Sequence, residues 1–337
     1  MTGTRAFGHL PDGGTVEEVT IAAGDLTVKV LTLGAIIRDV RLAGVAHPLV
    51  LGFDDIDGYL RHSPYFGAVV GRCANRIGGA RFTLDGVEHR LAANEGANQL
   101  HGGPDGFGHR NWRIVAHDDA SVTLALTSAD GDQGYPGTVE ATCRYVAEAP
   151  ATLRFEAEAT CDAPTIVNLA QHSYFNLDGS ADILDHAVRI DAGAYTPTGP
   201  GHVPTGEVRP VDGTPYDRRL PAPIRREEDG KRFAYDINYA VAASRAAEPR
   251  HQVRLESPAS GIALDVWSTE PGVQFYDGDY IDVPVPGLDG RRYGRNAGCC
   301  FEPQVYPDAP NHPGFPSAVL RPGEVYRQVT RFAFSRS

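Results

Sequence analysis

Apolar and polar residues alternate along much of the chain, a pattern typical of half-buried β-strands. The alternation recurs in the segments 26–30, 122–126, 139–145, 153–157, 253–255 and 262–266. Clusters rich in glycine, proline and aspartate, such as GDQGYPG and RPVDGTP, separate these segments and indicate turns and loops. Only residues 54–62, with the sequence DDIDGYLRH, suggest a helix, and it is a short one.

The chain shows no sustained 3.6-residue periodicity, which argues against alternating strand–helix–strand units. We therefore expect an all-β protein, a large single-domain antiparallel β-sandwich. The length of 337 residues allows either two ordinary domains or one large all-β domain. Because no linker rich in proline, serine or glycine and no internal repeat divides the chain, we expect residues 1–337 to form one domain.

Charge and composition narrow the classes of partner. The formal net charge is −12 and the lysines and arginines do not cluster, so we expect neither a nucleic-acid nor a membrane partner. No window approaches the ~18 consecutive apolar residues of a membrane span. The N-terminus lacks the basic and apolar regions of a signal peptide, which predicts a cytoplasmic protein.

The five cysteines are odd in number and lack CxxC spacing, so we expect reduced thiols rather than a disulfide framework or a zinc ribbon. Cys299 and Cys300 are adjacent in the sequence. In a strand they would point to opposite faces of the sheet, so at most one of them would line a site.

Two of the twelve histidines have unusual sequence neighbours. His101 lies in the glycine-rich segment NQLHGGPDGFG, and His172 lies in the apolar and aromatic segment NLAQHSYFNLDG. Either residue could be a hydrogen-bonded structural histidine. A zinc site is another interpretation, but no HxH or HxxxH spacing supports it, and we expect no metal.

Three further polar residues lie in apolar or aromatic surroundings. Glu302, in CCFEPQVYP, should be partly desolvated, which would raise its proton affinity and allow it to act as a base near neutral pH. A salt bridge at the end of a strand is the alternative for this residue. Asp236, in FAYDINYAV, and Gln274, in EPGVQFYDGDY, are flanked by aromatic residues. Such aromatics are core residues by default, but polar groups in an aromatic-lined cleft would suit a polyhydroxylated ligand.

Several long motifs together resemble those of the aldose 1-epimerases, also called galactose mutarotases. In order and spacing they are GRCANRIGGARFTLDG, NQLHGGPDGFG, VNLAQHSYFNLDG, TPYDRR, PGVQFYDGDY and FEPQVYPDAPNHPGFPSAVLRPGEVY. The similarity runs from about residue 15 to the end of the chain. It implies a single large antiparallel β-sandwich, a monomer or homodimer, that needs no metal or nucleotide cofactor. It also implies that a free hexose such as glucose or galactose is interconverted between its α and β anomers by acid–base catalysed ring opening.

The resemblance also implies roles for individual residues. Glu302 would be the base and His172 the acid, while His101 would hold the ring oxygen or an adjacent hydroxyl and could share the acid role. The residues that would bind sugar hydroxyls are Asn75, Arg76, Asp236 and Gln274. Arg72 is expected to be structural, and the glycines at positions 71, 78 and 79 would let the loop bend towards the cleft.

The chain departs from the family pattern near two of these motifs. Ile237 replaces the histidine that usually follows the aspartate, so we expect the surroundings of Asp236 to be less polar. Gly108 and His109 replace an Asp-Lys or Asp-Arg pair. These positions leave the identity of the sugar open.

Two other functions remain open. An epimerase for a phosphorylated or modified sugar would favour a cluster of arginines at the cleft, and the only basic segment near a candidate residue, PIRREEDGKR, is interleaved with acids. A non-catalytic carbohydrate-binding protein would need hydroxyl-binding groups but no matched acid and base.

Overall fold

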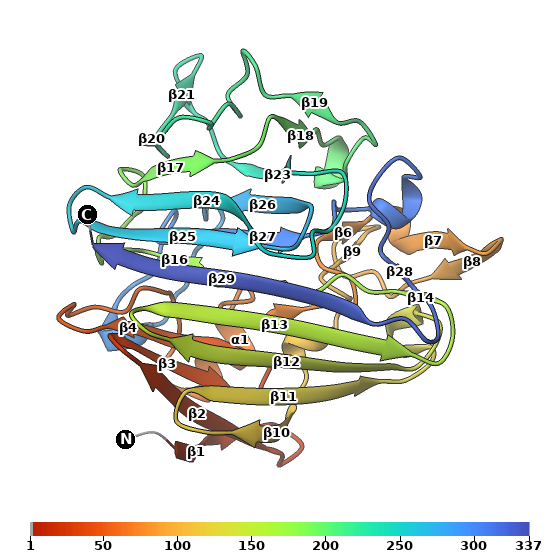
Figure 1. The fold of residues 1–337 in the computed structure, drawn as a ribbon, viewed down its shortest axis with the longest axis horizontal. Helices are drawn as coiled ribbons and strands as arrows, with labels where there is room; N and C mark the ends of the chain where they lie inside the picture. The colour runs from red at the N-terminus through yellow and green to blue at the C-terminus, as the bar shows by residue number, and fades with distance from the viewer. Residues whose placement is uncertain (1–2, 337) are drawn as a thin grey trace.

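The fold is built mainly from three antiparallel sheets (Figure 1). The computed structural model describes residues 3–336. The largest sheet has nine strands in the order β10 (Arg113–His117), β11 (Ser121–Ser128), β12 (Val139–Glu148), β13 (Thr152–Cys161), β29 (Tyr326–Arg336), β25 (Ile262–Ser268), β24 (Arg250–Ser257), β17 (Ala187–Ile190) and β20 (Ala222–Pro223). The six-stranded sheet has the order β16 (Tyr174–Phe175), β27 (Cys299–Gln304), β26 (Gly272–Tyr276), β23 (Asp236–Ala240), β18 (Ala194–Thr196) and β19 (Arg209–Pro210). The four-stranded sheet consists of β1 (Gly3–His9), β2 (Thr15–Ala23), β3 (Leu26–Leu31) and β4 (Ile37–Leu42).

Short strand pairs, one α-helix and six 3-10 helical turns complete the regular structure of the described residues. The pairs are β5 (Val69–Val70) with β15 (Ala170–Gln171), β6 (Arg76–Ile77) with β9 (Gln99–Leu100), β7 (Arg81–Leu84) with β8 (Val87–Arg90), β14 (Thr165–Ile166) with β28 (Val319–Leu320), and β21 (Glu227–Glu228) with β22 (Lys231–Arg232). The helix α1 (Ile56–His62) lies within the predicted segment 54–62 and begins after Asp55, whose side chain accepts a hydrogen bond from the Gly58 N–H. Within residues 3–336, no helix is long and apolar enough to span a bilayer.

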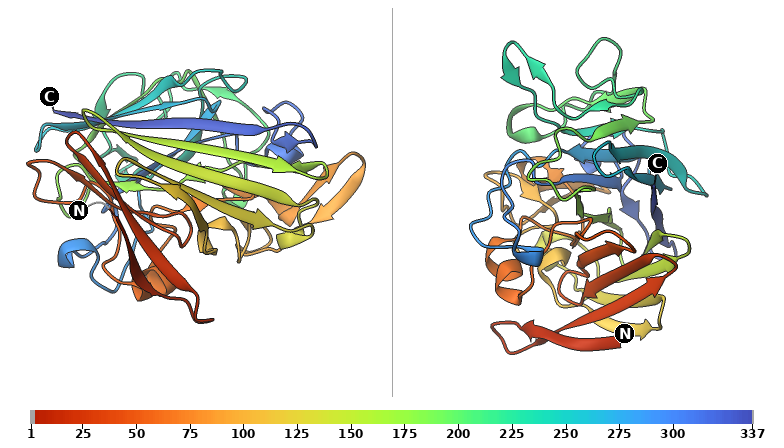
Figure 2. Two further views of the ribbon diagram at one scale, coloured as in Figure 1. Left: turned by 60° about the horizontal axis from the view of Figure 1, so that its bottom comes forward. Right: turned by 90° about the vertical axis from the view of Figure 1, so that its left-hand side faces the viewer.

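The sheets pack against one another through their apolar faces, as in a sandwich. Strands β2 and β3 of the four-stranded sheet contact β11 and β12 of the nine-stranded sheet, and Figure 2 shows the two sheets crossing. On the other side, Phe175 of β16 packs against Phe332 of β29, with ring centroids 5.4 Å apart. One hydrophobic cluster extends through these layers from Val19 to Phe334. The prediction of an all-β antiparallel sandwich is therefore confirmed.

The predicted alternation appears in the strands as alternating burial. In β12, Val139, Ala141, Cys143 and Tyr145 are buried, whereas the residues between them are partly or fully exposed. Each of the six segments predicted from alternation lies within a strand, namely β3, β11, β12, β13, β24 and β25. Alternation identified these strands because one face of each packs against the core and the other faces solvent.

The six-stranded sheet has one face in the core and a second face that carries polar side chains. In β27, Cys299 and Phe301 belong to the main hydrophobic cluster, whereas Cys300 belongs to a separate cluster on the opposite side. The prediction that the two cysteines point to opposite faces is confirmed. Glu302 lies two residues after Cys300 and therefore shares its face. This face forms the floor of the site described next.

Candidate active site

Three predicted residues lie on neighbouring strands of the six-stranded sheet. Asp236 begins β23, Gln274 lies in β26 and Glu302 lies in β27. Gln274 pairs directly with Glu302, which places their side chains side by side on one face. The Gln274 amide donates a hydrogen bond of 2.6 Å from Nε2 to Asp236 Oδ1. The register of three strands thus brings one amide and two carboxylates together.

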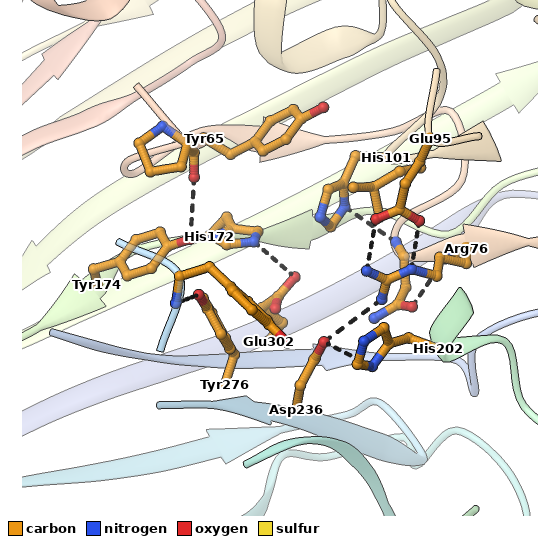
Figure 3. A pocket seen from close by; sticks show the side chains of 14 residues that line it. Tyr65, Arg76, Glu95, His101, His172, Tyr174, His202, Asp236, Tyr276 and Glu302 are labelled. Carbon is orange, nitrogen blue, oxygen red and sulfur yellow. Dashed lines mark hydrogen bonds and ion pairs between the residues drawn. The ribbon is translucent and has the colours of Figure 1, made fainter. Parts of the chain in front are cut away.

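The glycine-flanked loop supplies Asn75 and Arg76 from the opposite side. Asn75 adopts a left-handed φ of 60°, a conformation that asparagine tolerates better than most residues. Arg76 donates from Nε and Nη2 to the two oxygens of Glu95, over 2.6 and 2.8 Å, and its Nη1 lies 3.7 Å from Asp236 Oδ2. The guanidinium is therefore held between two carboxylates, with one edge facing the sheet (Figure 3).

Arg72 points away from this site into the protein. It is buried, and its guanidinium donates to the main-chain carbonyls of Ser128, Ala129, Pro136 and Gly137. The prediction that Arg72 is structural is confirmed. Of the three flanking glycines, only Gly79 has a positive φ, of 62°. The expected bend is therefore located at Gly79.

The two predicted histidines face each other across the site. His101 follows β9, His172 lies between β15 and β16, and their ring centroids are 5.0 Å apart. His172 Nε2 lies 3.6 Å from Glu302 Oε2, and Figure 3 shows the two side chains pointing towards each other. The loop after His101 requires glycine at position 102, because a Cβ there would lie 1.8 Å from the Gly71 carbonyl oxygen.

These side chains surround a single cavity of about 430 Å³. Six of the seven predicted residues line it, namely Asn75, Arg76, His101, His172, Asp236 and Glu302. Gln274 does not line the cavity and instead contacts Asp236. Aromatic rings form much of the remaining wall, contributed by Tyr65, Tyr174, Tyr276 and Tyr280. The combination of polar groups with flat apolar surface suits a polyhydroxylated ring.

Burial shifts the proton affinities of the groups in the floor. Desolvation raises the pKa of Glu302 to about 8, and the Asp236 carboxylate raises it further while Arg76 opposes the shift. Desolvation lowers the pKa of His172 to about 4. The pKa of His101 is also well below its usual range because of burial and the nearby His172 and Arg76. At neutral pH the Glu302–His172 pair therefore holds one proton.

His101, His172 and Glu302 also have potential metal-ligating atoms within 4.8 Å of one another. However, the Asn75 main-chain N–H donates to His101 Nδ1 over 3.1 Å, so the neutral ring carries its proton on Nε2. His101 thus offers the cavity an N–H donor and not a lone pair. The cluster suits a hydroxyl-bearing ligand better than a cation, and the absence of a metal cofactor stays a prediction.

Comparison with known proteins agrees with this geometry. Residues 17–333 match the family described as aldose 1-epimerase. The chain belongs to the aldose 1-epimerase family. This epimerase is similar to galactose mutarotase of Bos taurus, with 41% identity over 98% of each chain, and to aldose 1-epimerase of Escherichia coli K12, with 34% identity over 96% of each chain. It also resembles the crystal structure of the GalM/aldose epimerase homologue from C. elegans, with a TM-score of 0.87, 31% identity, and coverage of 95% of this chain and 98% of the other. It is an isomerase that interconverts sugar anomers.

Sequence reasoning missed several residues that line the pocket of this epimerase. The most informative of these are Glu95, which holds Arg76, and His202, whose Nδ1 lies 3.7 Å from Asp236 Oδ2. Glu95 occurs in the segment NEGANQ, which has no large apolar residues, so the local sequence did not indicate that Glu95 lines a site. Its position six residues before His101 was the available clue.

The expectation that Ile237 makes the surroundings of Asp236 less polar is wrong. Ile237 is buried on the core face of β23, because side chains alternate along a strand. Asp236 instead contacts Arg76, His202 and Gln274. His109, the other departure, packs its ring 5.2 Å from that of Tyr65 and does not line the cavity.

Proposed function

We propose that this epimerase opens and recloses the pyranose ring of free aldohexoses such as glucose and galactose, with Glu302 as the base and His172 as the acid. The observation that carries the proposal is the 3.6 Å separation of His172 Nε2 and Glu302 Oε2 in the floor of the cavity. The names of the relatives, galactose mutarotase and aldose 1-epimerase, support a free sugar as substrate.

The reaction needs one proton on the pair throughout. In the productive form Glu302 is a carboxylate and His172 an imidazolium. Glu302 takes the proton of the C1 hydroxyl, the bond between C1 and the ring oxygen breaks, C1 becomes a carbonyl carbon, and His172 protonates the ring oxygen. The pair is then left as carboxylic acid and neutral imidazole, the form that burial favours at neutral pH. Rotation about C1–C2 and the reverse transfers close the ring as the other anomer.

This chemistry requires no covalent intermediate. Water performs the reaction slowly, and acid–base assistance contributes roughly 10²–10⁴-fold, with further help from positioning. In this proposal Asn75, Arg76 and Asp236 bind hydroxyls, and His101 donates its Nε2–H to the ring oxygen or a neighbouring hydroxyl. Gln274 is proposed to help fix hydroxyls, supported by its hydrogen bond to Asp236.

The charge of the cavity favours a free sugar over a phosphorylated one. Arg76 is the single arginine or lysine that lines the cavity among the described residues, and Glu95 and Asp236 already contact it. A phosphate group would therefore meet carboxylates without a free cation to bind it. A non-catalytic sugar-binding role would not require a buried acid and base in contact, such as His172 and Glu302.

The proposal extends to the whole molecule. Residues 1–337 are taken as one domain, supported by the hydrophobic cluster that joins the sheets. The lack of disulfides among the described cysteines supports a location in the cytoplasm, and the net charge of −12 argues against a nucleic-acid or membrane partner. A monomer or homodimer is proposed from the family resemblance alone.

Polarimetry of freshly dissolved α-D-glucose and α-D-galactose tests the proposal. The purified protein should accelerate the relaxation of both sugars towards anomeric equilibrium. If the folded protein accelerated neither, a free hexose would not be its substrate.

A further inference from the structure

The thiol of Cys300 contacts the histidine that we assign as the acid. Its Sγ lies 3.4 Å from His172 Nδ1, while the other ring nitrogen, Nε2, lies 3.6 Å from Glu302 Oε2. Cys300 and Glu302 are two residues apart on β27 and therefore point to the same face. One strand thus contacts both nitrogens of the imidazole.

We propose that Cys300 is a positioning residue that sets where His172 carries its proton. The sulfur accepts the N–H of Nδ1 in the neutral ring, which leaves the lone pair of Nε2 facing Glu302 and the cavity. This is the tautomer that remains once Nε2 has given its proton to the ring oxygen. When His172 becomes an imidazolium, the sulfur still accepts the N–H of Nδ1, and the proton on Nε2 faces the substrate. This inference rests on the proposed function, because only a histidine that gains and loses a proton in each half-reaction needs a partner for both states.

A buried thiol suits this dual requirement. Burial raises the pKa of Cys300 well above its usual range, and the nearby Glu302 and Cys299 raise it further, so the group stays an S–H. A thiol is both a weak donor and a weak acceptor, and it holds neither state of the imidazole strongly. A carboxylate at this position would instead stabilise the imidazolium, and a main-chain N–H would stabilise the neutral ring.

The thiol also has a partner for its own proton. Tyr174 pairs with Cys300 across β16 and β27, and its hydroxyl interacts with the thiol. That hydroxyl donates its hydrogen to the Pro64 carbonyl oxygen over 3.1 Å, so the phenolic oxygen is left to accept. The S–H therefore points to the Tyr174 oxygen, and the sulfur is left to accept the N–H of His172 Nδ1.

The other groups that face His172 do not take over this role. Tyr65 lies against the ring with centroids 5.9 Å apart, and its own pKa is raised by burial, so it stays neutral. His101 lies 5.0 Å away between centroids, and its Nδ1 already accepts the Asn75 N–H. Glu302 faces Nε2 and not Nδ1. Among these neighbours, only Cys300 contacts the far side of the ring.

Cys299 provides a matched control on the same strand. Both cysteines are fully buried, but Cys299 faces the main core, where its Sγ lies 3.9 Å from the Phe175 carbonyl oxygen. Replacing either cysteine with alanine removes one sulfur atom from a packed interior. A general packing effect should therefore appear in both variants, whereas an effect on His172 should appear only at Cys300.

The first experiment uses the full chain labelled with ¹⁵N-histidine and compares wild type with Cys300→Ala, Cys300→Ser and Cys299→Ala. NMR of the ring nitrogens, with His172 assigned by its absence in His172→Gln, reports the tautomer directly. We expect the Nδ1–H tautomer in wild type, Cys300→Ser and Cys299→Ala, and a shift towards the Nε2–H tautomer in Cys300→Ala. An Nε2–H tautomer in wild type, or an unchanged tautomer in Cys300→Ala, would overturn the proposal.

The second readout is catalytic. Cys300→Ala should lower kcat about five- to tenfold with little change in KM, which corresponds to the loss of one modest hydrogen bond. Cys300→Ser should restore kcat to within about twofold, since a hydroxyl also donates and accepts. Equal losses in Cys300→Ala and Cys299→Ala would contradict the positioning role. The NMR result does not depend on turnover, so failure of the proposed function and failure of this inference can be distinguished.

Discussion

Glu302 Oε2 lies 3.6 Å from His172 Nε2, and the two side chains are only 3% and 5% exposed. Burial disfavours the charged form of each group, so their pKa values move apart in opposite directions, to about 8 for Glu302 and about 4 for His172. Between these values the pair binds one proton, whichever residue holds it. The proposed reaction needs this one-proton state.

The first prediction concerns pH. Below about pH 4 both groups are protonated and no base remains, and above about pH 8 both have lost their protons and no acid remains. We expect kcat/KM to be bell-shaped, with a plateau between these limits, measured by polarimetry across the range and corrected for the uncatalysed rate. A rate that kept rising from pH 6 to pH 10 would show that a protonated group on this pair is not needed.

The second prediction concerns stability. The pKa of Glu302 is about 8 in the folded protein against 4.5 normally, so its contribution to stability is present below the normal pKa and is lost as pH rises through 8. Glu302→Gln has no such charge. Its free energy of unfolding relative to wild type should therefore increase by ~4 kcal/mol between pH 5 and pH 9, at about 1.4 kcal/mol for each pH unit up to 8, measured by urea denaturation. The same difference in free energy at both pH values would show that burial does not raise the pKa of Glu302.

The third prediction concerns Glu95, which holds Arg76 through two hydrogen bonds of 2.6 and 2.8 Å. Glu95→Gln should raise KM about tenfold with a smaller effect on kcat, because one charge-assisted contact is lost and the guanidinium is no longer fixed. Glu88→Gln, which removes an exposed ion pair with Arg90, is the control and should leave both constants unchanged. An unchanged KM in Glu95→Gln would show that Glu95 is not needed to position Arg76 for substrate binding.

The fourth prediction concerns specificity. Among residues 3–336, Arg76 is the one arginine or lysine that lines the cavity, and it lies between Glu95 and Asp236. We expect glucose 6-phosphate to be turned over with at least a ~10-fold lower kcat/KM than glucose, because its phosphate finds no free cation. Faster turnover of the phosphorylated sugar at low ionic strength would favour the alternative substrate class.

Much of the fold was predictable because alternation directly reports a sheet with one buried face. The segments 139–145 and 153–157 show it, and both are central strands of the nine-stranded sheet. The short strands such as β5 and β16 were not identified, because two residues are too few to show a period. The order of strands could not be predicted from local pattern, since β13, near the middle of the sequence, pairs with β29 at its C-terminal end.

Site residues were predictable where their sequence neighbours indicated burial or where a motif resembled that of a known family. Glu302 and His172 lie in apolar segments, which signalled burial, and both prove to be buried. The effect of Ile237 was misjudged, because whether it shares a face with Asp236 depends on strand alternation. The contacts of Glu95 and Cys300 needed coordinates, because each depends on a partner distant in sequence.

The most direct test of the central claim is the rate of anomeric relaxation of α-D-galactose with Glu302→Gln, measured by polarimetry beside wild type at pH 7. Glu158→Gln, an exposed glutamate on the nine-stranded sheet, is the control for loss of one carboxylate. We predict that folded Glu302→Gln loses about 10²–10⁴-fold in kcat while the control keeps the wild-type rate. A folded Glu302→Gln that relaxed the sugar as fast as wild type would contradict the assignment of Glu302 as the base.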